Sequence, residues 1–289
     1  MSVIRFKSFS SGSCGNCYLL AVEEEGIVTD SILIDAGVSY RRLKKEMETE
    51  RIPLDSLRAV LITHDHNDHI RSLGSYVKYL SLPVWATKTL HDAMAYRTYT
   101  LGSLCAVRRD LKAGEWNDIV PGVFSVRYFI VPHDATETVG YGIRIGSEQY
   151  PYVHITDIGA MTSEAMAFCA HARTVVIESN FDMDMLMGGP YPHDLKMRIC
   201  QGSGHLSNDG CAEAISKFYH PELSHIFLCH LSENNNTPEL ARKTSTEALA
   251  RLGFAPSYEG SAVYSRPDGD VVTLQPLPRR TPSVLFTLR

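Results

Sequence analysis

The chain has 289 residues, of which 44% are hydrophobic and 21% are charged, and its formal net charge is −5. This length and composition allow one large core or two smaller ones. The acidic balance excludes a protein that holds nucleic acid by bulk electrostatic attraction, so any such substrate must be bound by local contacts. No apolar run reaches the roughly 18 residues of a membrane-spanning helix, and residues 1–7 alternate polar and apolar side chains, unlike a signal peptide. We therefore expect a cytoplasmic protein that does not bind membranes.

Apolar periodicity predicts strands and helices along the whole chain. The expected strands cover residues 3–9, 17–22, 31–35, 59–63, 82–86, 124–131, 141–145, 152–156, 174–178 and 226–229. The expected helices are one with Leu43 and Met47 at helical spacing, an apolar-periodic segment over 70–80, and the segments 88–99, 163–170, 208–219 and 237–252. In the last of these, Thr237 and Pro238 fit an N-cap and a first helical position.

Polar residues recur at strand ends along one apolar framework, and the sequence has no solenoid-type repeat or low-complexity linker. We therefore expect one domain over residues 1–274. Residues 275–289 are expected to form a tail, rich in proline and arginine, that is loosely held.

The seven cysteines are odd in number and scattered along the chain, which is unlike a disulfide framework. Cys14 and Cys17 make a Cys-x-x-Cys motif, but no second pair follows at zinc-ribbon spacing. We interpret them as two small residues without a shared role, and we expect reduced thiols throughout.

A loop of small residues, 10–16, connects the first two strands. Its backbone amides and hydroxyls could approach an anion closely. Ser11, Ser13 and Asn16 are therefore candidate contacts to a phosphate or another part of a substrate. A glycine-rich turn of this kind is more often only a turn, so this prediction is the weakest of those for the site.

The most informative segment is the run His-Asp-His-Asn-Asp-His from His64 to His69, which directly follows an apolar strand. His64 and His66 leave an extended segment on the same side and can share one metal ion. If the chain then turns into a helix, Asp68 and His69 face a second ion, while Asp65 points away. These four ligands exceed the three that a one-metal site needs, which favours two ions about 3.5 to 4 Å apart. A tag or low-complexity tract does not fit an internal cluster between two apolar segments.

Three later segments repeat the pattern of an apolar strand that ends in a His or an Asp. His133 supplies a third imidazole for the first ion, Asp157 a carboxylate able to bridge both ions, and His230 a histidine for the second. A lone His or Asp at a strand end is more often a loop residue or a hydrogen-bonded core group. The prediction therefore depends on the form that the three segments share.

In this order the residues resemble the five motifs of the metallo-β-lactamase-fold hydrolases, beginning with Asp35 in Leu-Ile-Asp-Ala-Gly. The loop 11–16, the motif Gly-His-Leu-Ser-Asn at 204–208 and the segment 230–236 are similar to the WalJ/YycJ-like branch, which is related to the RNase Z and phosphonate-pathway phosphodiesterase groups. The resemblance covers most of the chain. It implies an α+β fold, a four-layer αββα sandwich with a metal site at one edge of its two sheets.

The resemblance also implies a role for each site residue. The implied metal ligands are His64, His66 and His133 for one ion, Asp68, His69 and His230 for the other, and Asp157 as the bridge between them. Asp35 corresponds to a buried carboxylate that orients the histidine motif. His205 is similar in position to the histidine that assists the leaving oxygen in phosphodiester-cleaving relatives, or it competes with His230 for the metal. Asp68 and Asp157 would hold the attacking hydroxide, so they join His205 as implied catalytic residues.

The function implied by the resemblance is that of a metal-dependent hydrolase, in which hydroxide activated by two metal ions cleaves a phosphodiester. Zinc is the default, and manganese and iron also suit the His and Asp ligands. DNA is the expected substrate, with 5'-to-3' exonuclease action in DNA repair as the sharpest version. His66 stands where the flavodiiron branch has Glu, which favours hydrolysis over redox chemistry. The alternatives are hydrolysis of a lactone, thioester or cyclic phosphodiester on the same fold and, less favoured, a non-catalytic metal-binding regulatory module.

Overall fold

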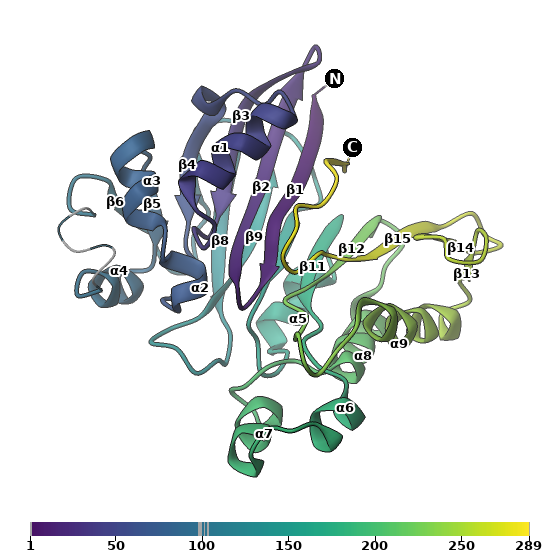
Figure 1. The fold of residues 1–289 in the computed structure, drawn as a ribbon. Coiled ribbons are helices and arrows are strands. Elements are labelled where there is room, and N and C mark those ends of the chain that lie inside the picture. The colour runs from purple at the N-terminus through teal and green to yellow at the C-terminus, as the bar shows by residue number, and fades with distance from the viewer. Residues whose placement is uncertain (1, 98–99, 101, 103, 289) are drawn as a thin grey trace.

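A computed structural model describes residues 2–97, 100, 102 and 104–288. Within these residues the strands form two sheets (Figure 1). The first sheet has the strand order β16-β1-β2-β3-β4-β5-β6, and the second has the order β13-β14-β15-β12-β11-β10-β9-β8-β7. The strands are β1 (Val3–Gly12), β2 (Gly15–Glu24), β3 (Ile27–Ile34), β4 (Leu57–Leu61), β5 (Val84–Ala86), β6 (Arg108–Asp110), β7 (Asn117–Val120), β8 (Phe124–Ile130), β9 (Val139–Ile145), β10 (Tyr152–Ile155), β11 (Thr174–Glu178), β12 (His225–Cys229), β13 (Ala255–Pro256), β14 (Val263–Ser265), β15 (Val271–Pro276) and β16 (Phe286–Thr287).

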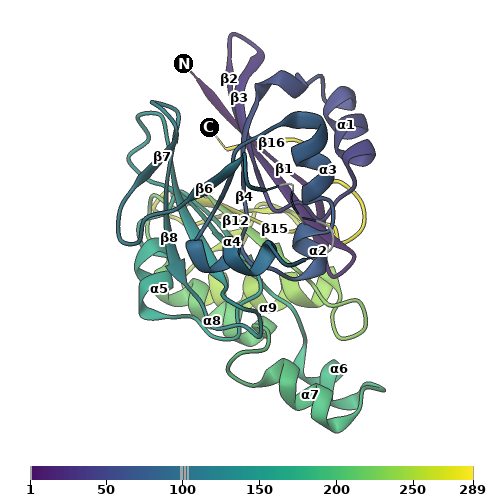
Figure 2. The same cartoon turned by 90° about the vertical axis from the view of Figure 1, so that its left-hand side faces the viewer.

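Helices cover the outer faces of both sheets. They are α1 (Tyr40–Thr49), α2 (Asn67–Ile70), α3 (Leu73–Leu80), α4 (Lys88–Met94), α5 (Ser163–Cys169), α6 (Met183–Gly188), α7 (His193–Cys200), α8 (Asn208–Phe218) and α9 (Pro238–Arg251), with a short 3-10 helix at Leu54–Ser56. Figures 1 and 2 show α1 and α3 beside the first sheet, α5, α8 and α9 beside the second, and α6 and α7 projecting away from both. The four layers confirm the expected αββα sandwich. No helix in the described part of the chain is both long and apolar enough to span a membrane.

Aromatic side chains from both sheets fill the space between them. The ring of Phe6 on β1 lies 4.8 Å from that of Phe227 on β12 and 5.8 Å from that of Tyr152 on β10, measured between centroids. β2 is buried at every residue from 15 to 22, because helices and the second sheet cover its two faces. A separate core lies between the second sheet and its helices α5, α8 and α9.

The strands and helices expected from the sequence are all present, with ends that shift by a few residues. The expected helix 88–99 is α4 (Lys88–Met94), and residues 98 and 99 lie outside the described residues. The predicted cap of α9 is confirmed, since the Thr237 hydroxyl accepts a hydrogen bond of 3.2 Å from the amide of Leu240. The unexpected elements, among them β6, β7, β13, α6 and α7, are short.

The tail is held firmly, so the expectation that it is loose is wrong for its described residues. β16 pairs with β1 in antiparallel register. The amide of Ser283 donates to the carbonyl of Ser8 at 2.8 Å, and Leu277 and Leu288 are buried. Proline content predicted flexibility, but pairing with the outer edge of β1 outweighs it.

Strand direction gathers the predicted site residues at one edge. β3 runs parallel to β4 in the first sheet. In the second sheet β10 runs parallel to β11, and β11 runs parallel to β12. The carboxyl ends of parallel strands meet at the same edge of a sheet. Asp35, Asp157 and His230 follow such ends, and each has a positive φ, of 64°, 51° and 52°. A left-handed residue reverses the chain sharply at a cost of about 1–2 kcal/mol, and Asp and His adopt this conformation more readily than most residues.

The aromatic contacts between the sheets predict a large loss of stability in Phe6→Ala. We expect the free energy of unfolding to fall by about 3–5 kcal/mol, because the cavity would border residues of both sheets. Urea denaturation measures this change. The matched control Ile27→Ala alters a side chain that is 63% exposed and should stay within about 0.5 kcal/mol of the wild type. Equal effects of the two substitutions would contradict the described packing.

Candidate metal centre

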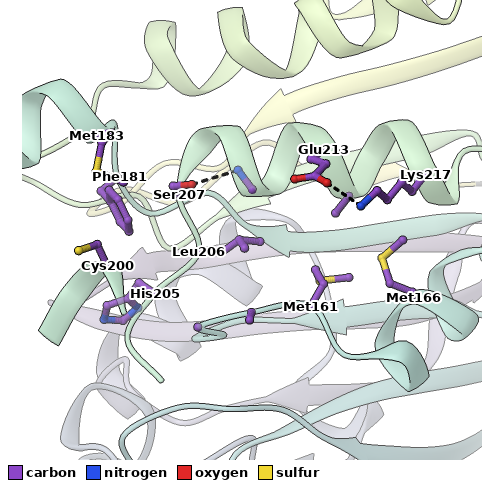
Figure 3. A pocket seen from close by; sticks show the side chains of 14 residues that line it. Met161, Met166, Phe181, Met183, Cys200, His205, Leu206, Ser207, Glu213 and Lys217 are labelled. Carbon is purple, nitrogen blue, oxygen red and sulfur yellow. Dashed lines mark hydrogen bonds and ion pairs between the residues drawn. The ribbon is translucent and has the colours of Figure 1, made fainter. Parts of the chain in front are cut away.

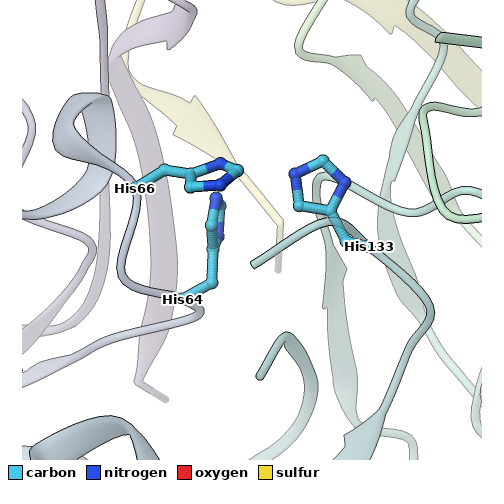
Figure 4. Close-up of side chains that lie close together, drawn as sticks. All are labelled: His64, His66 and His133. Atoms are coloured by element: carbon cyan, nitrogen blue, oxygen red, sulfur yellow. The ribbon is translucent and has the colours of Figure 1, made fainter. Parts of the chain in front are cut away.

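Three imidazoles from two segments converge at the first group of ligand atoms. His64 and His66 follow β4, and His133 follows β8 (Figure 4). One nitrogen of each lies within 4.8 Å of the others. The ring centroids are 4.7 Å apart for His64 and His66 and 5.1 Å apart for His66 and His133. The sequence prediction that these three side chains meet is therefore matched by the geometry.

The second group consists of Asp68, His69 and His230, whose ligand atoms also lie within 4.8 Å of one another. The chain turns into α2 after His66, as expected, and this turn directs Asp68 and His69 back toward the edge. Asp65 points away, where Arg97 donates to its carboxylate at 2.5 Å and the Thr136 hydroxyl does so at 2.8 Å.

Asp157 lies between the two groups. One of its carboxylate oxygens is 3.3 Å from Nε2 of His69, and the other is 3.8 Å from Nε2 of His133. A carboxylate that reaches both groups has the position expected of a bridging ligand.

Asp35 is fully buried and orients the histidine motif. Its carboxylate accepts a hydrogen bond of 2.7 Å from Nδ1 of His69. It also accepts bonds of 2.9 and 3.0 Å from the backbone amide and the hydroxyl of Thr63. With Nδ1 occupied, His69 presents Nε2 to the centre. Gly37 is needed in this turn, since a Cβ there would lie 1.7 Å from the carbonyl oxygen of Asp68.

Glu178 has the corresponding place in the second sheet, and sequence reasoning missed it. It is fully buried at the end of β11. Oε1 lies 2.8 Å from Nδ1 of His205 and 2.9 Å from Nδ1 of His230, while Oε2 accepts from the amides of Ile158 and Leu206. Its only sequence signal is a carboxylate that ends an apolar strand, the pattern already used for Asp157.

The donor set fits divalent cations. Nε2 of His64, His133 and His230 are buried atoms without a hydrogen-bond partner, which is costly unless another group binds them. Within the described part of the chain, the ion pairs of the carboxylates at the centre are to histidines, with no Lys or Arg among them; these carboxylates are Asp35, Asp68, Asp157 and Glu178. Buried negative charge of this density needs cations close by.

The pKa values of the buried histidines His64 and His230 shift in opposite directions. Burial lowers the pKa of His64 well below its usual value, and the neighbouring His69 lowers it further. Burial also lowers the pKa of His230, but the neighbouring carboxylates of Asp157, Asp68 and Glu178 outweigh it and raise this pKa to about 10. The carboxylates thus attract protons to the second group, where metal ions would compete with them.

A cavity of about 330 Å³ opens over both groups. Its lining includes His66, Asp68, Asp157, His205 and His230, together with Ser13, Asp134, Tyr191, Leu195, Arg198, Ile199 and Gly204. Asp134 and Arg198 were not expected there. The Arg198 guanidinium donates to Asp134 at 2.6 Å, and Asp134 lies 3.4 Å from Nε2 of His133. Arg198 is on α7, which the sequence pattern did not predict, so no signal could have placed it.

The loop 10–16 contributes one exposed residue to this cavity, Ser13. The prediction that Ser11 and Asn16 contact substrate is corrected, because both are fully buried. The Ser11 hydroxyl accepts from the amide of His230 at 2.9 Å. The side-chain nitrogen Nδ2 of Asn16 lies 2.8 Å from Nε2 of His69 and 3.1 Å from the carboxylate of Asp68. Both side chains therefore hold ligand segments in place.

The cysteines and His154 have contacts that are structural and not part of the metal centre. All seven cysteines are free. Cys14 and Cys17 have separate contacts, with Ser10 and Tyr76, as expected for residues without a shared role. His154 is buried beside the hydroxyl of Tyr152 at 3.0 Å.

Comparison with known proteins gives a family. Residues 30–230 match the family described as the beta-lactamase superfamily domain. Exodeoxyribonuclease YycJ of Bacillus anthracis is 31% identical over 252 residues, which are 87% of this chain and 91% of that protein. The chain belongs to the beta-lactamase superfamily.

Within the superfamily the chain belongs to the branch of YycJ and WalJ. Exodeoxyribonuclease WalJ of Streptococcus pneumoniae is 31% identical over 275 residues, 93% of this chain and 97% of WalJ. The crystal structure of unliganded yeast PDE1 shares the fold, with a TM-score of 0.66 over 98% of this chain and 99% of that one at 13% identity.

The contacts of Glu178 predict weaker metal binding in Glu178→Gln. An amide is a poorer acceptor for the two imidazoles, and loss of such a partner lowers metal affinity about 10–100-fold. Competition with a fluorescent zinc chelator measures this affinity. Glu164→Gln, which changes an exposed carboxylate on α5, should bind zinc like the wild type. Unchanged affinity in Glu178→Gln, in a protein that melts normally, would refute the orienting role.

Proposed function

We propose that this protein is a metal-dependent phosphodiesterase that degrades DNA, and that it acts as a 5'-to-3' exonuclease. The observation that carries the proposal is the pair of adjacent ligand groups, with Asp157 between them and four carboxylates, three of them buried, that have histidines as their ion-pair partners. The relatives named exodeoxyribonuclease support DNA as the substrate.

The ligand assignment of the proposal follows the geometry. His64, His66 and His133 would hold one ion, and Asp68, His69 and His230 the other, with Asp157 shared. Zinc is the default ion, with manganese or iron as alternatives. Two divalent ions at such a site would lower the pKa of a bound water molecule and would polarise the phosphoryl group. Asp68 and Asp157 accept hydrogen bonds from the attacking water and so orient it.

His205 is the proposed proton donor to the departing oxygen. It lines the cavity, and its side chain is 23% exposed. Glu178 binds Nδ1, which fixes the ring and leaves Nε2 for the substrate. His205 shares a candidate ligand group with Asp157, Glu178 and His230, but there its Nδ1 is held by Glu178, whereas the unpartnered Nε2 of His230 lies 3.7 Å from Asp68. This difference supports His230 as the ligand and His205 as the catalytic group.

Because the chain as a whole is acidic, binding of the phosphate backbone would depend on individual basic side chains near the site. Arg198 lines the cavity on one side. Near the loop 10–16, Arg71 donates to the carbonyl oxygen of Cys14, next to the exposed Ser13 that also lines the cavity.

The first test measures metal content and cleavage of 5'- and 3'-labelled single and double strands. His66→Ala and Asp157→Ala should lose activity by about three orders of magnitude or more, since each removes a ligand of the proposed ions. His171→Ala alters an exposed histidine outside both ligand groups and should cleave like the wild type.

Three results would overturn the proposal. The first is wild-type cleavage by both ligand variants. The second is turnover of bis-p-nitrophenyl phosphate by a protein that leaves labelled DNA intact, which would indicate a small-molecule hydrolase. The third is a metal-loaded protein without activity on a broad panel of substrates, which would indicate a regulatory module.

His205→Asn tests the proton donor. We expect kcat on DNA to fall about 10²–10⁴-fold, with the metal content unchanged. A phosphodiester with a p-nitrophenolate leaving group needs little protonation, so its hydrolysis should fall much less. Loss of metal, or an equal loss on both substrates, would instead make His205 a ligand.

A further inference from the structure

A second cavity, of about 360 Å³, lies beside the metal centre between the α5 region and α8 (Figure 3). We call it the α5–α8 groove. It is lined by Gly159, Ala160, Met161, Met166, Phe181, Met183, Cys200, His205, Leu206, Ser207, Gly210, Glu213, Ala214 and Lys217. Figure 3 shows Phe181, Met183 and His205 at one end and Met166 and Lys217 toward the other.

The groove adjoins the cavity over the metal ligands at His205. His205 lines both. The segment 199–206 separates them, with Ile199 and Gly204 on the metal side and Cys200 and Leu206 on the groove side. A molecule that has a phosphate at the metal ligands and extends past His205 therefore enters the groove.

The walls suit a flat, weakly polar group. Methionine side chains are flexible and polarisable and adapt to the shape of a ligand, and three of them line the groove together with Phe181. The Ser207 hydroxyl accepts a hydrogen bond of 3.0 Å from the amide of Gly210, and Lys217 pairs with Glu213 at 2.6 Å. The groove thus offers apolar contact to the face of a ring and few free hydrogen-bonding groups to its edge. Sites that bind single strands without sequence preference hold bases in this way.

The dimensions agree with a nucleoside. Helix α8 rises about 1.5 Å per residue, so its lining residues from Ser207 to Lys217 extend for about 15 Å. The volume of the groove lies within the range of about 300–1,000 Å³ that small-molecule sites have.

We propose that the α5–α8 groove binds the nucleoside attached to the departing oxygen of the scissile phosphodiester. His205 is the residue proposed to protonate that oxygen. Because it lies on the rim of the groove, the nucleoside on the leaving-group side of the phosphate is the one that enters the groove. This inference rests on the proposed function, which supplies the phosphodiester.

Binding is tested on the full-length, metal-loaded protein with deoxythymidine 5'-monophosphate, with [methyl-¹³C]methionine as the NMR label. We expect saturable shifts of the Met161, Met166 and Met183 signals, assigned by single Met→Leu substitutions. Met47 and Met94 are buried beside the first sheet and should not shift. Inorganic phosphate should leave the three groove signals unchanged. Shifts elsewhere with none in the groove would overturn the proposal.

The effect on cleavage is tested with Ala160→Trp, which fills the groove from an exposed position. Ala167→Trp is the matched control, because Ala167 is exposed on α5 but lines a different cavity. For a single-stranded oligonucleotide, Ala160→Trp should raise KM by about tenfold or more, the equivalent of one lost base contact. Hydrolysis of methyl p-nitrophenyl phosphate, which is too small to occupy the groove, should be unchanged, and Ala167→Trp should match the wild type on both substrates.

The outcomes separate the two proposals. Unchanged oligonucleotide kinetics in Ala160→Trp, or equal losses on both substrates, would overturn the groove while the nuclease function stands. If the wild type cleaves neither substrate, the nuclease function fails, and the methionine shifts alone decide whether the groove binds a nucleotide.

Discussion

Two buried carboxylates, one in each sheet, determine the direction of three imidazoles at this centre. Asp35 follows β3 and binds Nδ1 of His69, while Glu178 ends β11 and binds Nδ1 of His205 and His230. Both are fully buried, and their ionic partners are histidines. Because each fixes a ring through one nitrogen, the opposite nitrogen faces the centre. The same residues add negative charge that the protein does not neutralise with its own Lys or Arg in the described residues. Ring orientation and affinity for cations therefore have a common origin.

The backbone brings these groups together through strained turns. Asp35, Asp157 and His230 have positive φ directly after buried strands. Left-handed residues at functional sites persist because the surrounding structure holds them, and here the surroundings are two sheets packed through Phe6 and Phe227. The aromatic core is thus coupled to the site, since the separation of the sheets sets the distance between ligands from β4 and ligands from β10 and β12.

The sequence predicted this centre unevenly, for physical reasons. The run from His64 to His69 is local, so spacing alone places its ligands relative to one another. Glu178 was missed because its partners are 27 and 52 residues away, and a single carboxylate at a strand end has no local signature. Ser11 and Asn16 were expected at the surface because small polar residues favour turns, whereas the fold buries them against His230 and His69. Helix α7 has no buried residue, so it carries no apolar period, and Arg198 could not be anticipated.

The acidic charge of the chain has a different meaning once its location is known. At the sequence level, a net charge of −5 argued against binding of nucleic acid by bulk electrostatic attraction. Yet the four carboxylates at the centre account for most of that excess. Two divalent ions held as proposed add four positive charges and change the formal net charge from −5 to −1. The negative potential is therefore concentrated where cations bind, and the field that a DNA strand meets depends on metal loading and on Arg198, which lines the cavity. Bare-chain charge is a poor guide to substrate whenever buried ligands supply it.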